Sequence, residues 1–175
     1  DCGGCVLYVS FFLGSHSWSA SLLASKSKLM SYSVPRNELS SLCAGLELVY
    51  AALISLSLDI ESVLICTDSI VALCWALNRN ARHKTFVSNR VLTINRYLSW
   101  ISESLGQNKL VQLAHISGNI NIADILTKDH PNLLDLDIGS KWQQGMPWMH
   151  LDISAMPLTY HSDLTISKEE ILKVK

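Results

Sequence analysis

The sequence lacks the features that mark membrane and secreted proteins. No uninterrupted apolar run reaches the roughly 18 residues that a membrane-spanning helix needs, because the longest, Leu46 to Leu58, is broken by Glu47 and by serines. Residues 1–13 contain no basic segment of the kind that opens a secretion signal, and the chain does not begin with Met. We therefore expect a segment of a longer intracellular protein, not secreted and without a membrane partner.

The sequence also lacks a complete set of cysteine pairs. It has five cysteines, and without a secretion signal this odd number predicts free thiols in a reducing compartment. Cys2 and Cys5 have the spacing of a metal or redox pair, but no second cysteine or histidine pair accompanies them. We expect them to be small residues on a strand.

Acidic residues are missing from one long stretch. Residues 70–102 contain no Asp or Glu but include Arg79, Arg82, Lys84, Arg90 and Arg96. Such a basic run attracts phosphate groups, although a solvated helix face explains it equally well at this point. Hydrophobic residues make up 49% of the chain and charged residues 17%, which predicts a globular rather than a disordered protein.

The spacing of apolar residues predicts the elements of an α/β domain. The short apolar run from Val63 to Cys66 is typical of a strand buried on both faces. Apolar residues three and four apart predict a long amphipathic helix that Gly106 ends. The expected strands cover residues 6–13, 18–23, 29–34, 63–66 and 110–116, and the expected helices begin at Pro35, 70, 85 and 122.

This order of elements predicts a mixed sheet with helices on its faces, because an antiparallel meander is followed by strand–helix–strand units. We expect the domain to span residues 1–130. Residues 131–175 have a weaker pattern and are expected to form an irregular appendage or linker that docks by Trp142 and Trp148.

Three carboxylates stand where side chains are directed toward one end of such a sheet. Glu38 is expected in the first turn of the first helix, Asp68 at the carboxyl end of the buried strand, and Asp124 three residues after the expected cap Asn121. Carboxylates that converge repel one another, and a divalent cation relieves the repulsion. Mg²⁺ or Mn²⁺ suits these hard oxygen ligands, and two such ions can support an in-line displacement at phosphorus.

Each carboxylate also has a simpler explanation. Glu38 could be an anion favoured by the helix N-terminus, and Asp68 could cap the helix that follows it. Asp124 could complete a capping box with Asn121. Only the three residues together, on this order of elements, favour a metal site.

Five short segments stand in a fixed order over about the first 150 residues: VPRNEL (34–39), CTDS (66–69), FVSNRV (86–91), NINIAD (119–124) and KWQQGMPW (141–148). Each resembles a motif of the type 1 ribonuclease H domain of Bel/Pao retrotransposons, in a region often catalogued as the Pao retrotransposon peptidase family. The aspartic-protease motifs DTG and DSG are absent, so the resemblance does not imply protease chemistry.

The resemblance implies a ribonuclease H-like fold, with a mixed five-stranded sheet and helices on both faces. It implies cleavage of the RNA strand of RNA–DNA hybrids during reverse transcription, inside a polyprotein with reverse transcriptase and integrase regions. Glu38, Asp68 and Asp124 would then be catalytic metal ligands for Mg²⁺ or Mn²⁺, two ions in all. The family's fourth carboxylate lies on a first strand that we expect upstream of this chain, because Asp1 stands too close to Gly4 to replace it.

The chemistry of a hybrid substrate suggests further contacts. Proteins recognise double-stranded RNA geometry through phosphates and 2′-hydroxyls rather than base sequence. Asn37 and Ser69, beside two ligands, could reach sugar hydroxyls, and phosphate contacts are expected from Arg79, Arg82, Lys84 and Arg90. His115 falls on the expected strand and does not match the mobile histidine of the cellular enzymes, so activation of water would fall to the metals.

Other functions remain open for the chain. A catalytically silent domain of the same fold could bind nucleic acid or neighbouring polyprotein domains. An integrase-type nuclease would need a glutamate on a longer helix in place of Asp124. A plain interaction module would use Trp142 and Trp148 to hold a neighbour. If the chain is a ribonuclease of this family, we expect it in the cytoplasm, the nucleus or a virus-like particle.

Overall fold

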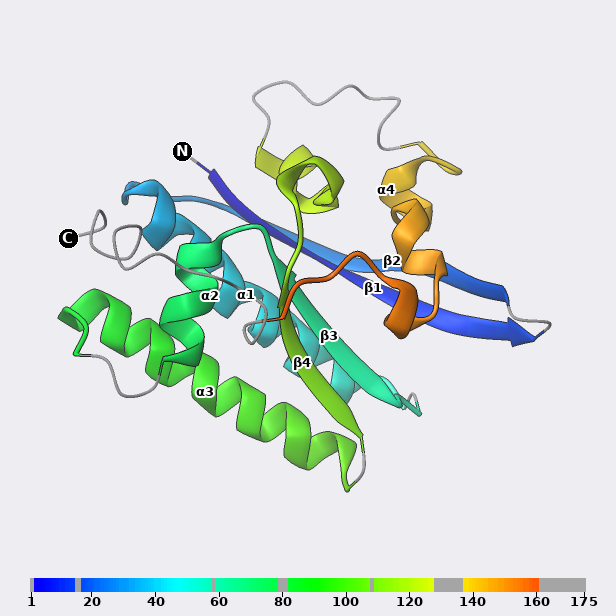
Figure 1. The fold of residues 1–175 in the computed structure, drawn as a ribbon, viewed down its shortest axis with the longest axis horizontal. Coiled ribbons are helices and arrows are strands. Elements are labelled where there is room, and N and C mark those ends of the chain that lie inside the picture. Colours follow the sequence, from blue (N-terminus) through cyan, green and yellow to red (C-terminus); the bar gives the residue numbers. More distant parts are fainter. Residues whose placement is uncertain are drawn as a thin grey trace.

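The computed structural model describes residues 2–14, 17–57, 59–78, 82–107, 109–127 and 137–160. Asp1 and Arg79, and the boundary expected at residue 130, lie outside these ranges. The described chain is a mixed α/β structure in which a hairpin, three helices and a parallel strand pair are followed by short helical segments (Figure 1).

The hairpin is longer than the apolar pattern predicts. Strand β1 (Cys2–Gly14) pairs antiparallel with β2 (Ser17–Leu29). The separate strand expected over 29–34 is wrong, because β2 continues to Leu29 and the next residues lead into a helix. Residues 25–28, which lie between the two expected strands, are polar and exposed, and a solvent-facing strand tolerates polar side chains.

The central elements follow the predictions closely. Helix α1 spans Val34–Ser55, α2 spans Ile70–Leu77 and α3 spans Thr85–Leu105, where Gly106 ends the helix with a φ of 87°. Strand β3 (Ser62–Thr67) pairs in parallel with β4 (Leu110–His115). The parallel pair and its helices therefore form as the sequence pattern predicts.

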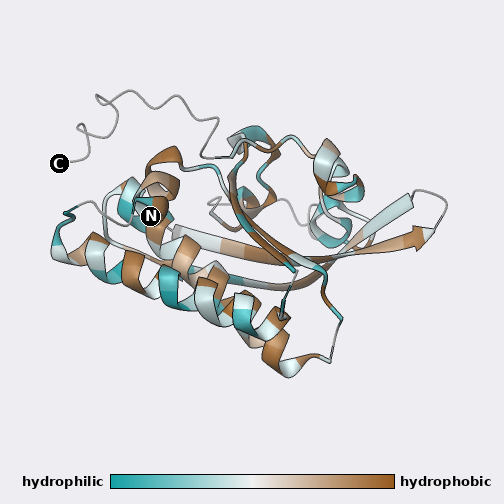
Figure 2. Cartoon of the chain, turned by 60° about the horizontal axis from the view of Figure 1, so that its bottom comes forward, coloured by the Kyte–Doolittle hydropathy of each residue, from teal (hydrophilic) through white to brown (hydrophobic). Residues whose placement is uncertain are grey.

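The three long helices and β3 enclose the larger of two hydrophobic cores. Figure 2 shows hydrophilic and hydrophobic residues alternating along α3, as expected for a helix with one buried stripe. We call the buried set the helix-side core: Leu39, Leu42, Leu46, Ile65, Ala72, Trp75, Ala76, Val87, Val91, Ile94 and Ile101.

Helix α1, with 22 residues, is long and apolar enough to cross a membrane by length and composition alone. The core helix of a soluble protein passes the same test. Leu39, Leu42 and Leu46 of α1 are buried in the helix-side core, so this stripe of the helix packs against protein.

Residues 137–160, which we call the strap, cover a different part of the hairpin. The strap contains α4 (Lys141–Gln144) and the 3₁₀ turns η4 (Pro147–His150) and η5 (Ile153–Ala155). Two further 3₁₀ turns, η1 (Gly118–Ile120) and η2 (Ile122–Thr127), precede it. The smaller core, the strap-side core, consists of Ala20, Ile122, Trp142 and Met149.

Directional contacts tie the strap to the rest of the chain. The Tyr8 hydroxyl donates to the Trp142 carbonyl oxygen at 2.6 Å, and the Trp148 indole N–H donates to the Ile120 carbonyl oxygen at 3.2 Å. His115 and Thr159 exchange two backbone hydrogen bonds of 2.8 and 3.0 Å. The strap is thus anchored to β1, to the loop before η2 and to β4.

Adjacent glycines show that α1 and η2 lie on opposite faces of β1. A Cβ atom on Gly3 would collide with the Ser41 side chain of α1, whereas one on Gly4 would come 2.8 Å from Leu126 Cβ of η2. Successive strand residues point to opposite faces. The hairpin is therefore sandwiched between two layers, and both approaches are close enough to need glycine.

The strands form two sheets in the described chain rather than one. The orders are β1-β2 and β3-β4, with no pairing between β1 and β3. The expected α/β class is confirmed, whereas a continuous five-stranded sheet is not formed by the described residues.

Candidate metal and nucleic-acid site

Glu38 lies just beyond the first turn of α1. The helix begins at Val34, one residue earlier than predicted, because Ser33 has an extended cap conformation and Pro35 fits the first turn. The first turn contains no acidic residue, so the expected first-turn position of Glu38 is wrong. Since the helix dipole acts mainly within the first turn, its interaction with Glu38 should be weak.

Asp68 is not a helix cap. It connects β3 to α2, and the cap of α2 is Ser69, whose hydroxyl accepts a hydrogen bond from the Ala72 N–H at 3.1 Å. The simpler explanation that the sequence allowed for Asp68 is therefore wrong. Asp68 stands at the carboxyl end of a strand, where open α/β sheets place their ligands.

Ser69 links the first two carboxylates. Its hydroxyl donates to Glu38 Oε2 at 2.5 Å. Burial raises the pKa of Glu38, the Ser69 hydrogen bond opposes this rise, and the negative charge of Asp68 adds to it. The two carboxylates are thus close enough to repel each other, which is the arrangement that a cation relieves.

Asn37 and Ser69 are less accessible than their proposed sugar contacts would require. They are 5% and 6% exposed, and the Ser69 hydroxyl already serves Glu38 and Ala72. Asn37 Oδ1 is buried without a hydrogen-bond partner in the described structure. In this conformation Ser69 positions Glu38.

Asp124 is held by the turn that carries it. The Asn121 amide donates to Asp124 Oδ1 at 3.4 Å, while Asn121 Oδ1 accepts from the Ala123 N–H at 3.1 Å. The expected helix is a 3₁₀ segment, Ile122–Thr127, and the carboxylate accepts from Asn121 rather than completing a capping box. This short turn orients the side chain of Asp124.

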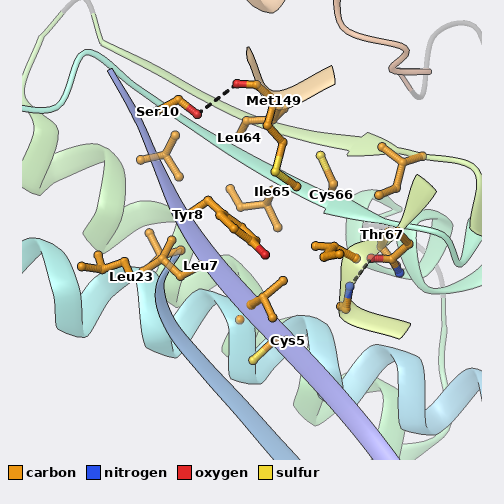
Figure 3. Close-up of a pocket in the computed structure, with 18 of the residues that line it drawn as sticks. Cys5, Leu7, Tyr8, Ser10, Leu23, Leu64, Ile65, Cys66, Thr67 and Met149 are labelled. Atoms are coloured by element: carbon orange, nitrogen blue, oxygen red, sulfur yellow. Dashed lines mark hydrogen bonds between the residues drawn. The ribbon is translucent and has the colours of Figure 1, made fainter. Parts of the chain in front are cut away.

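Glu38, Asp68 and Asp124 line one cavity of about 1270 Å³, which runs between β1 and β3 (Figure 3). Among the described residues, however, no group of three or more His, Cys, Asp or Glu side chains is close enough to hold a metal ion together. The structure brings Glu38 and Asp68 together and places Asp124 on the same cavity without joining it to them.

The basic residues lie at the end of the molecule where α1 begins. Arg82 and Lys84 are exposed just before α3. The Arg90 guanidinium stacks on the Phe86 ring at 4.4 Å, and that of Arg36 approaches the same ring at 5.4 Å. The Arg90 side chain therefore packs within α3, and the Arg36 side chain joins α1 to α3, while Arg82 and Lys84 remain open to solvent.

Two residues near Asp68 were not predicted as part of the site. His115 ends β4, as a strand residue should, and its Nε2 lies 3.2 Å from the Asp68 carbonyl oxygen. A Cβ atom on Gly118 would lie 3.6 Å from Asp68 Oδ2. Neither has a local sequence signal for this role, because both reach Asp68 only through the parallel pairing of β3 and β4.

Comparison with known proteins supports the resemblance for the first part of the chain. Residues 2–69 match the family model described as the Pao retrotransposon-like RNaseH-like domain. No curated protein matches the chain. Glu38 and Asp68 fall inside the matched range and Asp124 outside it. The resemblance to this family that the sequence motifs indicate is therefore confirmed over residues 2–69.

Proposed function

We propose that this chain is the ribonuclease H-like part of a retrotransposon polyprotein, and that its intact domain cleaves the RNA strand of RNA–DNA hybrids. One observation carries the proposal: Glu38, Asp68 and Asp124 come from three separate elements and line the same cavity, with Glu38 beside Asp68. The family match over residues 2–69 supports the fold that this requires.

The donor set fits a hard divalent cation. Glu38 and Asp68 would hold Mg²⁺ or Mn²⁺, and Asp124 would complete the set if its turn moved toward them. When bound, two such ions supply charge that stabilises the attacking and leaving oxygens of phosphodiester hydrolysis. The resemblance implies a further catalytic carboxylate, on the first strand of the family's domain.

Other side chains would position these groups. Ser69 fixes the Glu38 carboxylate through its hydroxyl, and Asn121 fixes Asp124. Arg82 and Lys84 would contact phosphates of the hybrid, because they are exposed on the acid-free stretch near the start of α1. The phosphate contact of Arg79 stays a prediction, because this residue lies outside the described ranges.

A second candidate is a catalytically silent domain that grips nucleic acid or neighbouring polyprotein domains. The observation in its favour is that no three acidic side chains meet as a metal site among the described residues. In the ribonuclease, replacing a carboxylate would lower the cleavage rate. In the silent domain, it would affect only folding.

The test is cleavage of a labelled RNA–DNA hybrid in Mg²⁺ and in Mn²⁺. The proteins are this chain, a version with an added N-terminal strand that ends in aspartate, and the extended version with Asp68→Asn. We expect the extended protein to cut the RNA strand, and Asp68→Asn to lower the rate by about a hundredfold or more, since a metal ligand supports several kcal/mol of transition-state stabilisation.

Asp59→Asn in the extended protein is the matched control. Asp59 precedes β3 and Asp68 follows it, so the control alters an acid at the opposite end of the same cavity. Its rate should stay near that of the unsubstituted protein. Hybrid binding without cleavage, in the extended protein and in both metals, would favour the silent domain instead.

A further inference from the structure

Two arginines from different helices meet at one aromatic ring. Arg36 stands in the first turn of α1 and Arg90 in the second turn of α3, and these turns lie at the same end of the molecule (Figure 1). Their guanidinium carbons are 5.4 and 4.4 Å from the centre of the Phe86 ring. The ring attracts both cations and so holds them near each other. We call Arg36 and Arg90 the arginine pair.

No carboxylate of the described residues neutralises the arginine pair. The ion pairs between described residues join other side chains, Lys26 to Glu47 and Lys109 to Asp59. The sequence around the second arginine offers no acid either, because residues 70–102 contain no Asp or Glu. Two like charges held close together repel each other, and an anion bound between them relieves the repulsion.

The N–H groups of the arginine pair are available to a ligand. Neither guanidinium donates a hydrogen bond to a described residue, and neither is among the described polar atoms that are buried without a partner. The N–H groups therefore reach solvent, although both side chains are half-buried. Each guanidinium offers five donors in a planar fork, which matches the oxygens of a phosphate group.

The arginine pair is separate from the candidate metal site. Arg36 stands two residues before Glu38, and side chains two residues apart on a helix do not share a face. Glu38 accepts the hydrogen bond of Ser69 at the start of α2, whereas Arg36 reaches Phe86 on α3. An anion on the arginine pair would therefore bind beside the carboxylates and not among them.

An exposed aromatic ring borders the arginine pair. Tyr32 precedes α1, is 44% exposed, and its ring centre lies 4.7 Å from that of Phe86. Proteins that bind single strands stack unpaired bases on such rings and on guanidinium planes. The exposed Arg82 and Lys84 precede Phe86 in the sequence and offer further phosphate contacts. This combination suits a nucleotide better than an isolated phosphate ion.

We propose that the arginine pair binds the phosphate monoester at the end of a nucleic-acid strand, while the terminal base stacks on Tyr32. A phosphate monoester carries about two negative charges at neutral pH, whereas each phosphodiester along a strand carries one. Only the end of a strand therefore matches both positive charges of the pair. The choice of nucleic acid rests on the function proposed above, but the binding requires no cleavage.

The test compares two single-stranded oligonucleotides of the same sequence, one with a 5′-phosphate and one with a 5′-hydroxyl. Each carries a fluorescent label at its 3′ end, and its binding to this chain is followed by anisotropy. EDTA in the buffer removes divalent cations and so prevents hydrolysis. We expect the phosphorylated strand to bind about tenfold more tightly, because charge-assisted bidentate hydrogen bonds are strong.

Three single variants locate the phosphate. Arg36→Gln and Arg90→Gln should each remove most of the preference for the phosphorylated strand. Arg96→Gln is the matched control, because Arg96 is exposed on the same helix almost three turns after Phe86. It loses the same charge, so it should weaken both strands equally and keep the preference. Circular dichroism checks that each variant remains folded.

Tyr32→Ala tests the base contact separately and leaves both guanidiniums in place. Because the Tyr32 ring is largely exposed, its removal should not unfold the chain. We expect binding of the phosphorylated strand to weaken by about fivefold or more, since stacking of a base on an aromatic ring is lost. The affinity for inorganic phosphate, measured by competition, should not change.

Three results would overturn the proposal. The first is equal binding of the two strands, and the second is a preference that survives in both Arg36→Gln and Arg90→Gln. The third is a phosphoserine peptide that competes as well as the phosphorylated strand, since the ligand would then be a phosphopeptide. All three are read without cleavage. A chain that binds the phosphorylated end but never cuts a hybrid would contradict the proposed hydrolysis alone.

Discussion

The helix-side core and the strap-side core are stabilised in different ways. Eleven buried residues from α1, α2, α3 and β3 form the first, whereas four form the second. The helix side has long helices whose apolar stripes face one another. The strap side has short turns that are fixed by hydrogen bonds from Tyr8, Ser10 and Trp148.

Because of this difference, the two cores should affect different properties: the helix-side core the free energy of folding, and the strap-side core the geometry of the candidate site. Hydrophobic stabilisation grows with buried apolar area, so most of the folding free energy should come from the helix side. The strap contributes less area but contacts the loop before Asp124 through Trp148 and Ile120. We infer that damage to the helix side unfolds the chain, whereas damage to the strap mainly disturbs the site.

The largest effect should come from truncating the helix-side core. Ile94 is fully buried on α3, so Ile94→Ala should lower the free energy of unfolding by about 2 to 5 kcal/mol. The control Leu92→Ala changes a side chain that is 52% exposed on the same helix, and it should stay within about 0.5 kcal/mol of the unsubstituted chain. Urea unfolding measures both. Equal losses would mean that this core does not dominate stability.

Alkaline pH should weaken the helix side first. Burial raises the pKa of Cys43 from 9.0 to about 11, against the opposing charge of Arg90, and burial raises the pKa of Tyr8 from 10.0 to about 12. Above pH 9 the unfolded chain loses the thiol proton while the folded chain keeps it, so stability falls as pH rises. For Cys43 the loss is on the order of 1 to 2 kcal/mol by pH 11.

The midpoints of urea unfolding from pH 8 to pH 11 test whether Cys43 loses its stabilising effect at lower pH than Tyr8. Cys43→Ala and Tyr8→Phe are the variants compared with the unsubstituted chain. Cys43→Ala should reduce the pH dependence above pH 9 without abolishing it, because burial also raises the pKa of Cys66 to about 12. Tyr8→Phe should change it only above pH 10. An unchanged slope in Cys43→Ala would show that this thiol does not titrate abnormally.

Trp148 offers a smaller and more local change. Trp148→Phe keeps an aromatic ring but removes the N–H that donates to the Ile120 carbonyl oxygen. We expect a loss of about 1 kcal/mol, together with faster amide exchange over residues 118–127 and little change in α1 or α3. Exchange that accelerates equally in all elements would contradict the separation of strap and helix side.

The predictions from sequence succeed where structure depends on local periodicity. The spacing of Val87, Val91 and Ile94 predicts α3 over residues 85–105, and the helix has these bounds. The apolar run of β3 and the Gly106 cap were likewise predictable. Each of these depends on neighbours within a few residues along the chain.

The predictions fail where long-range contacts decide the structure. Ser69 meets Glu38 from 31 residues away, and Tyr8 meets Trp142 from 134 residues away. No local pattern reports such pairings. The continuation of β2 to Leu29 was not predicted, because its exposed polar residues are held in the strand by pairing with β1 and not by a local apolar pattern.

For the site, strand topology predicted that Glu38, Asp68 and Asp124 point toward one end of the sheet, and all three line one cavity. Their separation was not predictable, because it depends on the 3₁₀ turn that carries Asp124, where the sequence pattern had indicated a helix. The roles of Glu38, Asp68 and Asp124 as metal ligands stay predictions until cleavage is measured.

The smallest effect should come from the ion pair between the hairpin and α1. Lys26 Nζ lies 2.9 Å from Glu47 Oε2, but these side chains are 47% and 52% exposed. Water screens such a pair, and ordering two long side chains costs entropy, so the coupling should be only about 0.2 to 1 kcal/mol. A double-mutant cycle of Lys26→Ala and Glu47→Ala measures it, and the coupling should shrink further in high salt. If the coupling instead exceeded the cost of Trp148→Phe, this surface ion pair would contribute more to stability than the hydrogen bond between the strap and η1, and the comparison of the two cores would have to include it.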